Sequence, residues 1–428
     1  MIRTVVVGGG AAGFFAAIGI AAATASGEVT ILERGREVLE KVRISGGGRC
    51  NVTHACWDPA ELVKFYPRGG RELLGPFHKF ACGDTMGWFG DRGVALKVEE
   101  DGRVFPESDR SQTIIDCLWS EARRLGVRVV KNARVRELLP PATRQLVPHS
   151  VGTAPPTNGA PVEASGGRWT VKTQDASYVA DRLVITTGSN PAMWKILEGL
   201  GHRIVPPVPS LFAFNVPDRK LRALAGISLP WVGMHLADDA LQAEGPLLIT
   251  HKGLSGPAIL RLSAWGARQL HPRNYDFSVG VNWTNQRTED VVAELADLRQ
   301  GQARRQLGSR AYLDVPLRLW QYLVVRAGIP TEQQWAQLSR TQLRALATEL
   351  TDGRYPVRGK ATNKDEFTTA GGVDLREVDF RSFQSVHYPN LYLAGEVLDI
   401  DAITGGFNFQ AAWTGGHLIG QHTLHSAL

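Results

Sequence analysis

The pattern of hydrophobic and polar positions over the first forty residues predicts a strand, a helix and a second strand. A β-branched strand from Thr4 to Val7 ends at a glycine turn, small helix-forming residues fill 11–25, and a second apolar strand over 29–32 ends at Glu33. A unit of this length joins two parallel strands through a right-handed crossover. The sequence therefore opens with a parallel α/β sheet.

Further strands and helices follow in the same pattern. We expect a helix that has Ser111 as its N-cap and runs to about Leu125. The residues from Pro140 to Gly167 carry no apolar period, which predicts a flexible excursion between strands. The strands expected on either side of it cover 127–130, 169–173 and 183–187.

A stretch rich in proline begins near residue 191 and marks a second region. Short strand-like pieces follow as far as Val281, and apolar residues recur at helical spacing over 288–350. The sheet pattern resumes near Phe367. We therefore expect a strand-rich part and a helical part inserted into one discontinuous sheet domain.

Length and composition restrict the class of protein. A chain of 428 residues predicts two or three domains, and 43% hydrophobic with 21% charged residues is typical of a globular protein. No apolar run reaches the roughly 18 residues that span a bilayer. The strand Val5–Val7 leads at once into glycines, unlike a secretory signal. We therefore expect a cytoplasmic protein without a membrane partner.

Charge and cysteine content narrow the chemistry. The net charge of +6 comes from interleaved acidic and basic residues, which favours a solvated surface over a nucleic-acid patch, so no nucleic-acid partner is expected. Cys50, Cys56, Cys82 and Cys117 form no C-x-x-C pair, which argues against a redox disulfide and a zinc ribbon. We predict no metal site, and either a monomer or a homodimer.

Gly8, Gly10 and Gly13 fit the pattern G-x-G-x-x-G between the first strand and its helix. The first glycine permits a tight turn, the second lets a pyrophosphate approach the backbone, and the third lets the helix pack closely. Glu33 follows Gly13 by 20 residues, where an acid accepts hydrogen bonds from a ribose and repels a 2′-phosphate. FAD and NAD both fit this loop. The alternative is a simple tight turn with a solvated Glu33.

A second glycine-rich loop spans 41–53. Its three successive glycines can bring backbone N–H groups against a ligand, Arg43 and Arg49 flank them, and Asn51 can bond the edge of a heterocycle. This composition is typical of a pyrophosphate or flavin contact, and the alternative is a flexible linker. Cys50 is either a buried structural thiol or a redox group.

A third element stands near the other end of the chain. A hydrophobic strand leads into Gly395 and Glu396, where flavoproteins of the glutathione-reductase type place an acid on the ribityl hydroxyls. Residues 405–408 would open a helix whose N-terminus stabilises negative charge at flavin N1 and O2. A nicotinamide enzyme has no need of this element, so the pair favours FAD. The alternative is a loop that leads to a C-terminal helix.

Seven motifs carry a family resemblance. GGGAAG, SGGGRCNVTH, GRVFP, THKGLSGP, TAGGV, AGEVLD and TGGFN occur in the order seen in aminoacetone-oxidase/BaiN-like flavoproteins, which the chain resembles over nearly its whole length. The resemblance implies an FAD-binding oxidoreductase whose inserted part is a β-barrel followed by a small helical piece. Where that family often shows T-M-E-S-K, this chain has RSFQSV over 381–386 and lacks both the acid and the lysine.

Patterns and resemblance together predict an α/β, Rossmann-like fold. We expect a discontinuous FAD-binding domain over 1–190 and 356–428, a β-barrel-like insert over 191–285, and a helical subdomain over 286–355. The candidate cofactor contacts are Gly8, Gly10, Ala11, Ala12, Gly13, Glu33, Arg34, Lys41, Arg43, Ser45, Gly47, Gly48, Arg49, Cys50, Asn51, Val135, Thr187, Gly188, Gly395, Glu396, Gly405, Gly406, Phe407 and Asn408.

The predicted chemistry is hydride transfer through flavin N5 to or from a small molecule, with NAD(P)H or an amine-type compound as reductant. No second glycine fingerprint marks a nicotinamide domain, so NAD(P)H would bind transiently. Arg49 is a catalytic candidate that could place charge near the flavin, and His251 is a candidate acid or base. The alternatives are phosphate binding for Arg49 and a turn contact for His251.

Two other classes of function stay open. The basic balance of the chain suggests a flavin-dependent nucleic-acid-modifying enzyme. The third possibility is a non-catalytic flavin-binding redox module.

Overall fold

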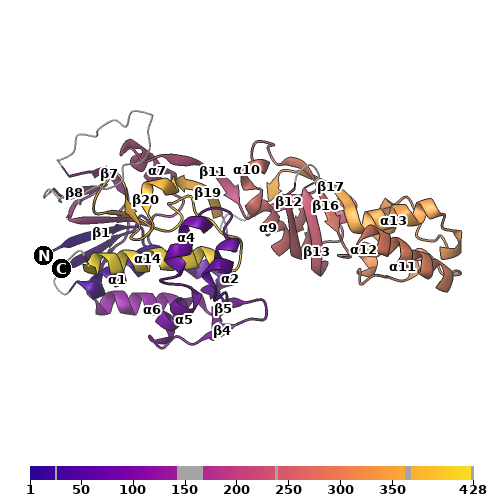
Figure 1. Cartoon of the computed structure of the whole chain (residues 1–428), viewed down its shortest axis with the longest axis horizontal. Helices are drawn as coiled ribbons and strands as arrows, with labels where there is room; N and C mark the ends of the chain where they lie inside the picture. The colour runs from indigo at the N-terminus through magenta and orange to yellow at the C-terminus, as the bar shows by residue number, and fades with distance from the viewer. Residues whose placement is uncertain (25–26, 142–166, 237–239, 362–367, 426–428) are drawn as a thin grey trace. The chain divides into compact units, whose positions relative to one another are not determined.

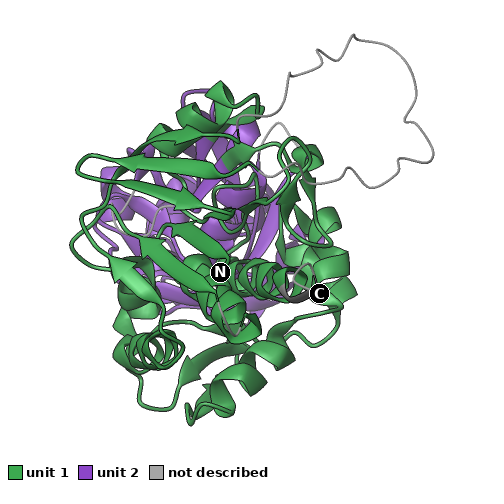
Figure 2. Cartoon of the chain, turned by 90° about the vertical axis from the view of Figure 1, so that its left-hand side faces the viewer, with its two compact units in different colours: residues 1–207, 371–428 green, residues 208–370 purple. Residues whose placement is uncertain are grey.

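A computed structural model describes residues 1–24, 27–141, 167–236, 240–361 and 368–425 of the chain. The excursion expected from Pro140 to Gly167 lies almost entirely outside these residues. The chain divides into two compact units, one formed by residues 1–207 and 371–428 and the other by residues 208–370 (Figure 2).

The first unit is built on a seven-stranded sheet whose strands lie in the order β20-β21-β22-β10-β1-β2-β6 (Figure 1). Val6 pairs with Val184 on one side and with Ile31 on the other, and all three side chains are fully buried. A parallel sheet covered on both faces needs such continuous apolar strands. The parallel strands are β1 (Arg3–Val7), β2 (Glu28–Leu32), β6 (Arg128–Val130), β10 (Arg182–Ile185) and β22 (Leu391–Leu393), and β20 (Val378–Asp379) and β21 (Gln384–Ser385) join them in antiparallel fashion.

Helices from the two ends of the chain pack against each other in this unit. Helix α1 (Ala11–Ala23) follows the glycine turn, and α14 (Phe407–His425) follows the return strand (Figure 1). A Cβ added to Gly420 would lie 2.8 Å from Gly19 Cα, and one added to Gly416 would lie 2.8 Å from the Ala12 carbonyl oxygen. Glycine therefore permits the close approach that joins the two ends of the chain.

Two small sheets and six more α-helices belong to the described part of the first unit. One correction concerns Ser111, which is the first residue of its helix and not the N-cap; Arg110 holds the N-cap position, and the Ser111 hydroxyl donates to the Arg43 carbonyl at 2.8 Å. The small sheets are β3 (Thr53–His54), β5 (Arg103–Pro106) and β4 (Leu96–Val98), then β7 (Val135–Leu139), β8 (Trp169–Thr173) and β9 (Ser177–Ala180). The helices are α2 (Glu40–Gly48), α3 (Pro59–Leu62), α4 (Gly70–Phe77), α5 (Cys82–Gly90), α6 (Ser111–Arg124) and α7 (Pro191–Gly199).

The second unit contains a seven-stranded antiparallel sheet in the order β17-β16-β13-β14-β15-β12-β18. Its edge strands are separated in the chain by Gly359 alone, and the Asn215 N–H donates to the Gly359 carbonyl at 3.1 Å, so the sheet curls back on itself as a barrel does. The strands are β12 (Ala213–Asn215), β13 (Ser228–Leu236), β14 (Gln242–Thr250), β15 (Gly253–Ser255), β16 (Asp276–Asn282), β17 (Gly353–Arg358) and β18 (Lys360–Ala361).

The helices of the second unit share one core with this sheet. Buried residues such as Met234 and Val279 of the strands belong to the same cluster as Trp320 and Leu346 of the helices. The strand-rich and helical parts, which we expected as separate segments, thus fold around a common core. The helices are α8 (Arg219–Arg222), α9 (Pro257–Trp265), α10 (Ala267–Leu270), α11 (Thr288–Gly301), α12 (Leu317–Arg326) and α13 (Arg340–Asp352).

The boundary between the units lies inside a two-stranded ribbon of β11 (Ile204–Ser210) and β19 (Thr368–Val373). Helix α7, expected to begin the insert, belongs instead to the first unit. The proline-rich stretch that we took as the start of the second region includes β11, and an edge ribbon tolerates proline because its free side needs no N–H donor.

Candidate functional site

The three glycines of the first loop have two different roles. Gly8 has φ +112°, and an added Cβ would lie 2.4 Å from the Thr186 carbonyl oxygen; at Gly13 it would lie 2.0 Å from the Gly8 carbonyl oxygen. Both glycines are therefore required by the packing of the turn itself. Gly10 has nothing within 4 Å of an added Cβ, so its face is open, at the N-terminus of α1 where Ala11 and Ala12 begin the helix. An open backbone at a helix N-terminus suits a phosphate.

Glu33 is held beside this loop. Its carboxylate accepts from the Gly9 N–H at 2.8 Å and from the Gly35 N–H at 2.7 Å. Its carbonyl accepts from the Ala133 N–H at 2.7 Å, which brings the segment that leads to the buried Val135 to the same strand end. Arg34, the next residue after Glu33, is exposed. Contacts of Glu33, Arg34 and Val135 with a nucleotide stay predictions.

The second loop is a broken helix. Helix α2 loses helical geometry from Ser45 to Gly47, and the Ser45 hydroxyl donates to the Val42 carbonyl at 3.0 Å. Gly47 and Gly48 have positive φ and open space at their Cβ positions, like Gly10. The Leu39 N–H donates to the Gly9 carbonyl at 2.8 Å, so this segment is tied to the first loop.

The two arginines of the second loop are engaged by protein groups. Arg43 donates to the Gln112 side chain at 2.8 Å. Arg49 lies over the Phe105 ring at 3.9 Å and pairs with Glu99 at 2.6 Å and Asp109 at 3.4 Å. The hydrogen bond that Arg49 donates to the Glu99 carboxylate raises the pKa of the Arg49 guanidinium. The catalytic and phosphate-binding roles of Arg49 both stay predictions.

Cys50 is completely buried and sits at φ +63°. Burial raises the pKa of its thiol to about 12. The thiolate is the reactive form of cysteine, so this environment supports the structural reading of Cys50 and not the redox one.

An ion pair links the second loop to the return segment. The Lys41 ammonium bonds the Glu396 carboxylate, whose side chain is 17% exposed. Gly395 precedes it with φ +75°, and an added Cβ there would meet only Ala12, at 3.3 Å. Residues 355 positions apart in the chain thus meet at one place, as expected for a site shared by both ends.

The start of α14 is confirmed near residue 405, but two of its side chains turn to the protein. Phe407 is buried and stacks on Phe65 with 4.4 Å between ring centroids. The Asn408 amide bonds Ala402, accepting from its N–H at 2.9 Å and donating to its carbonyl at 3.2 Å. These two residues brace the loop before α14, and a contact of theirs with the cofactor stays a prediction.

Asn51 reaches the same helix start. With its amide oriented to satisfy both ends, the oxygen accepts from the Gly406 N–H at 3.0 Å and the nitrogen donates to the Thr53 carbonyl at 2.9 Å. A Cβ on Gly406 would lie 2.5 Å from the Thr53 carbonyl oxygen, so a glycine is needed there. The second and third predicted elements are therefore in direct contact.

Sequence reasoning did not single out three residues that lie at this site. His54 bonds the Gly405 carbonyl at 3.1 Å through Nδ1, and Arg68 forms a two-pronged ion pair with the completely buried Asp401. His54 ends the quoted motif SGGGRCNVTH, so its position in that motif was an available signal. No local pattern links Arg68 to Asp401, which are 333 residues apart.

The strand end of β10 contributes an unused donor. Thr186 donates to the Val7 carbonyl at 3.1 Å and to the Gly8 carbonyl at 3.0 Å. The Thr187 hydroxyl is buried and has no hydrogen-bond partner among the described residues, and Gly188 has open space at its Cβ position. Open glycines and an unsatisfied hydroxyl at the ends of parallel strands fit an extended dinucleotide.

His251 lies apart from this set in the chain. It is exposed in the turn between β14 and β15 of the second unit, whereas every other candidate belongs to the first. Its role as an acid or base stays a prediction.

The fold and the open glycine cradle, which is formed by Gly10, Gly47 and Gly48, define the class of protein. This class is a flavoprotein oxidoreductase with a Rossmann domain. The model of the HI0933-like protein Rossmann domain matches residues 2–422, and the chain belongs to that family. It is an FAD-dependent oxidoreductase. No helix in the described ranges is both long and apolar enough to cross a bilayer.

Curated relatives cover nearly the whole chain. A ribosomal RNA dihydrouridine synthase of Escherichia coli is 27% identical over 421 residues, 96% of this chain and 95% of the relative. One of Haemophilus influenzae is 25% identical over 425 residues, 97% of this chain and 96% of the relative. A 3-dehydro-bile acid delta(4,6)-reductase of Clostridium scindens is 26% identical over 455 residues, 98% of each.

The matches to solved structures are distant. The 3-ketosteroid-delta4-(5alpha)-dehydrogenase of Rhodococcus jostii RHA1 is 14% identical with a TM-score of 0.49, over 99% of this chain and 97% of that one. A flavocytochrome c3 fumarate reductase is 13% identical with a TM-score of 0.47, over 100% of this chain and 78% of that one.

Proposed function

We propose that this protein is a flavin-dependent reductase whose acceptor is a small molecule with a carbon–carbon double bond conjugated to a carbonyl. The open cradle formed by Gly10, Gly47 and Gly48 carries the flavin part of this proposal. The relatives support the direction of the chemistry, because "dihydrouridine synthase" and "delta(4,6)-reductase" both describe the addition of hydrogen to a double bond. Bound FAD would supply a hydride from N5, with NAD(P)H as its transient reductant.

Residues of the first unit would hold the cofactor. Gly10 and the N-terminus of α1 would receive the pyrophosphate, Glu33 the adenosine ribose, and Glu396 the ribityl hydroxyls. The N-terminus of α14 has no acidic residue in its first turn, so its positive end is available to stabilise negative charge near the ring.

Anaerobic bleaching of the flavin tests this proposal. The protein reconstituted with FAD is mixed with NADH, NADPH or a panel of small amines, and the flavin absorbance is followed. A conjugated enone is then added, with the matching saturated ketone as control. We expect bleaching by a nicotinamide and recovery of colour with the enone alone. Absence of flavin absorbance after reconstitution, or equal recovery with both ketones, would contradict the proposal.

A second candidate acceptor is a uridine of ribosomal RNA, which the names of two relatives favour. The uracil double bond is conjugated to a carbonyl, so the same hydride chemistry applies, and the net charge of +6 suits a polyanionic substrate. Incubating reduced protein with unmodified ribosomal RNA and analysing its nucleosides by mass spectrometry separates the two acceptors. Formation of dihydrouridine at one position would replace the small-molecule proposal.

A further inference from the structure

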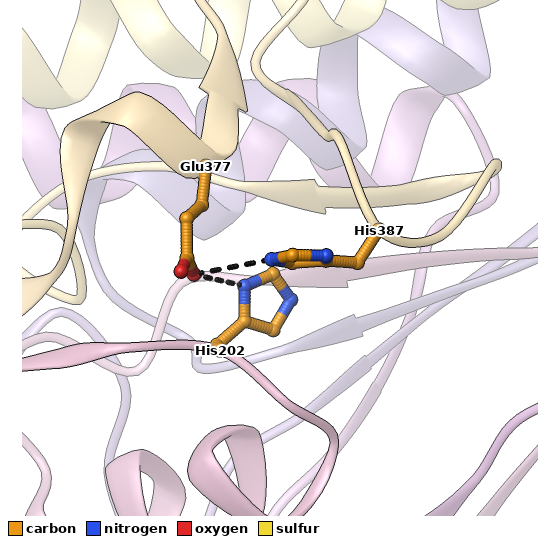
Figure 3. A group of neighbouring side chains, drawn as sticks. All are labelled: His202, Glu377 and His387. Atoms are coloured by element: carbon orange, nitrogen blue, oxygen red, sulfur yellow. Dashed lines mark hydrogen bonds and ion pairs between the residues drawn. The ribbon is translucent and has the colours of Figure 1, made fainter. Parts of the chain in front are cut away.

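Two histidines and a glutamate converge in the first unit, away from the residues discussed above. Figure 3 shows the side chains of His202, Glu377 and His387 turned toward one another, with one ligand atom of each within 4.8 Å of the others. His202 lies between α7 and β11, Glu377 ends the short 3-10 helix Leu375–Glu377, and His387 follows β21. No local sequence pattern predicts this group, because His202 and Glu377 are 175 residues apart.

The distances are those of a nearly formed metal site. Glu377 Oε2 lies 3.0 Å from His202 Nδ1 and 3.5 Å from His387 Nε2. Four ligands at bonds of about 2.0–2.2 Å in a tetrahedron are about 3.3–3.6 Å apart. The two observed distances lie close to this value. A metal ion could therefore be bound with only small movements of the three side chains.

One nitrogen of the group has no hydrogen bond. His387 Nε2 is shielded from solvent, yet within the described part of the chain it has no hydrogen-bond partner. It faces the Glu377 carboxylate, and its ring meets the His202 ring edge to face at 4.9 Å. A buried polar atom without a hydrogen bond is unusual and is typical of a place that takes a water or an ion.

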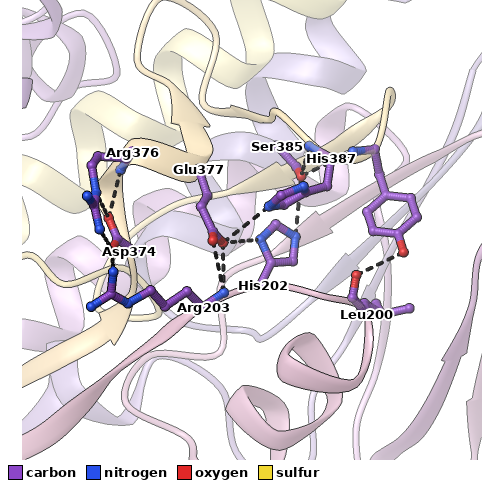
Figure 4. A network of polar contacts seen from close by, with 9 residues as sticks. Leu200, His202, Arg203, Asp374, Arg376, Glu377, Ser385 and His387 are labelled. Carbon is purple, nitrogen blue, oxygen red and sulfur yellow. Dashed lines mark hydrogen bonds and ion pairs between the residues drawn. The ribbon is translucent and has the colours of Figure 1, made fainter. Parts of the chain in front are cut away.

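The surrounding groups hold the side chains of His202 and Glu377 and the backbone of His387 in place (Figure 4). The Ser385 hydroxyl lies 3.3 Å from His202 Nε2 and accepts from the His387 N–H at 3.1 Å. The Glu377 carboxylate accepts from the Arg203 N–H at 3.0 and 2.9 Å. A histidine that binds metal is nearly always held through its other ring nitrogen in this way, and a hydroxyl can serve either tautomer.

We propose that His202, Glu377 and His387 form a binding site for a divalent transition metal, zinc above all, with water as the fourth ligand. Two imidazoles and one carboxylate are a ligand set that zinc prefers, whereas calcium and magnesium prefer oxygen ligands alone. The metal would tie residue 202, just before β11, to residues 377 and 387, which follow β19. It would therefore fix the base of the ribbon through which the chain leaves and re-enters the first unit.

Zinc titration of the untagged, FAD-loaded full chain tests the site. We expect one zinc per chain, retained through dialysis against metal-free buffer, and an X-ray absorption spectrum of nitrogen and oxygen ligands with two imidazoles. The variants His387→Gln and Glu377→Gln should each bind zinc roughly 10–100-fold more weakly or worse. His78→Gln, which changes an exposed histidine of the same unit, is the matched control and should bind normally.

The outcomes decide the proposal. Absence of stoichiometric zinc, sulfur ligation in the spectrum, or equal binding by His387→Gln and His78→Gln would overturn it. If Glu377→Gln does not fold, His387→Gln still decides, because the His387 side chain is 27% exposed and its replacement is tolerable. Ser385→Ala keeps all three ligands but removes the hydroxyl beside His202, so it should weaken zinc binding roughly 10-fold. A hydrogen-bond network that binds no metal would show no such change.

Discussion

Gly10 and Gly13 offer a direct test of how the first loop works, because their substitution by alanine should affect two different properties of the protein. Gly10 has φ −91° and ψ −168°, which alanine also adopts, and nothing lies within 4 Å of an added Cβ. Gly13→Ala would place a methyl group 2.0 Å from the Gly8 carbonyl oxygen. We therefore expect Gly10→Ala to affect the ligand and Gly13→Ala to affect the fold.

The magnitudes follow from two opposing terms. Gly→Ala at a compatible position stabilises by about 0.4–1 kcal/mol through the unfolded chain, and the loss of glycine at an N-cap costs up to about 1 kcal/mol. The free energy of unfolding of apo Gly10→Ala should thus stay within about 1 kcal/mol of wild type. Gly13→Ala forces the backbone apart and should cost about 3 kcal/mol or more.

The same methyl group at Gly10 would occupy space that we assign to the pyrophosphate. Overpacking of about 1–3 kcal/mol corresponds to roughly 5–150-fold weaker FAD binding. Thermal unfolding of the apo proteins and quenching of flavin fluorescence measure the two effects separately. Wild-type FAD affinity in Gly10→Ala, or an equal loss of stability in both variants, would refute this account of the loop.

Three further predictions concern other contacts. Glu396→Gln should weaken FAD binding roughly 10-fold or more, because hydrogen bonds to a charged acceptor contribute about 1.5–3 kcal/mol. Lys41→Met, which removes the half-exposed partner of Glu396, should change the free energy of unfolding by less than about 1 kcal/mol. Equal FAD affinities of Glu396→Gln and wild type in a titration would contradict the role of Glu396. Asp401→Asn should destabilise by about 3–5 kcal/mol in urea unfolding, since it removes the charge with which the completely buried Asp401 pairs with Arg68, and a loss below about 1 kcal/mol would show that the pair is dispensable. Partial desolvation of Asp218 is outweighed by the Tyr322 hydroxyl, which donates to it at 2.6 Å, and by nearby groups, so the pKa of Asp218 lies below the ordinary 3.8. The stabilisation that ionised Asp218 contributes to the fold is therefore complete above pH 3.8 and is lost as the pH falls through the lower pKa of the folded state. Tyr322→Phe should cost about 1.5–3 kcal/mol at pH 7, whereas Tyr312→Phe, which removes a buried hydroxyl without a hydrogen-bond partner in the described residues, should cost nothing.

Local sequence patterns predict most of the nucleotide-binding domain. The β-branched runs of β1 and β2, the turn glycines and Glu33 are adjacent in sequence, and each has a backbone reason that holds before tertiary contacts form. The start of α14 was readable for the same reason. The directions of the Phe407 and Asn408 side chains could not be predicted, because a side chain at the start of a helix can point to a ligand or to the protein. For Phe407, stacking on the distant Phe65 sets the direction.

Contacts between distant segments account for the rest. The pair Arg68–Asp401 and the group around Glu377 are assembled by the sheet from residues with no common spacing. The expected end of the first unit, residue 190, came too early because the proline-rich stretch indicates a new region unless the ribbon partner of β11, the strand β19 more than a hundred residues later, is known.

The ribbon of β11 and β19 also makes residues 208–370 a cassette. A Cβ on Gly371 would lie 2.6 Å from Pro207 Cα, so the points at which the chain leaves and re-enters the first unit are neighbours. Removing the cassette would require only a short turn between Pro207 and Gly371, and closing so short a gap costs little chain entropy. In evolutionary terms, one domain of this kind can be exchanged for another while the nucleotide fold stays intact.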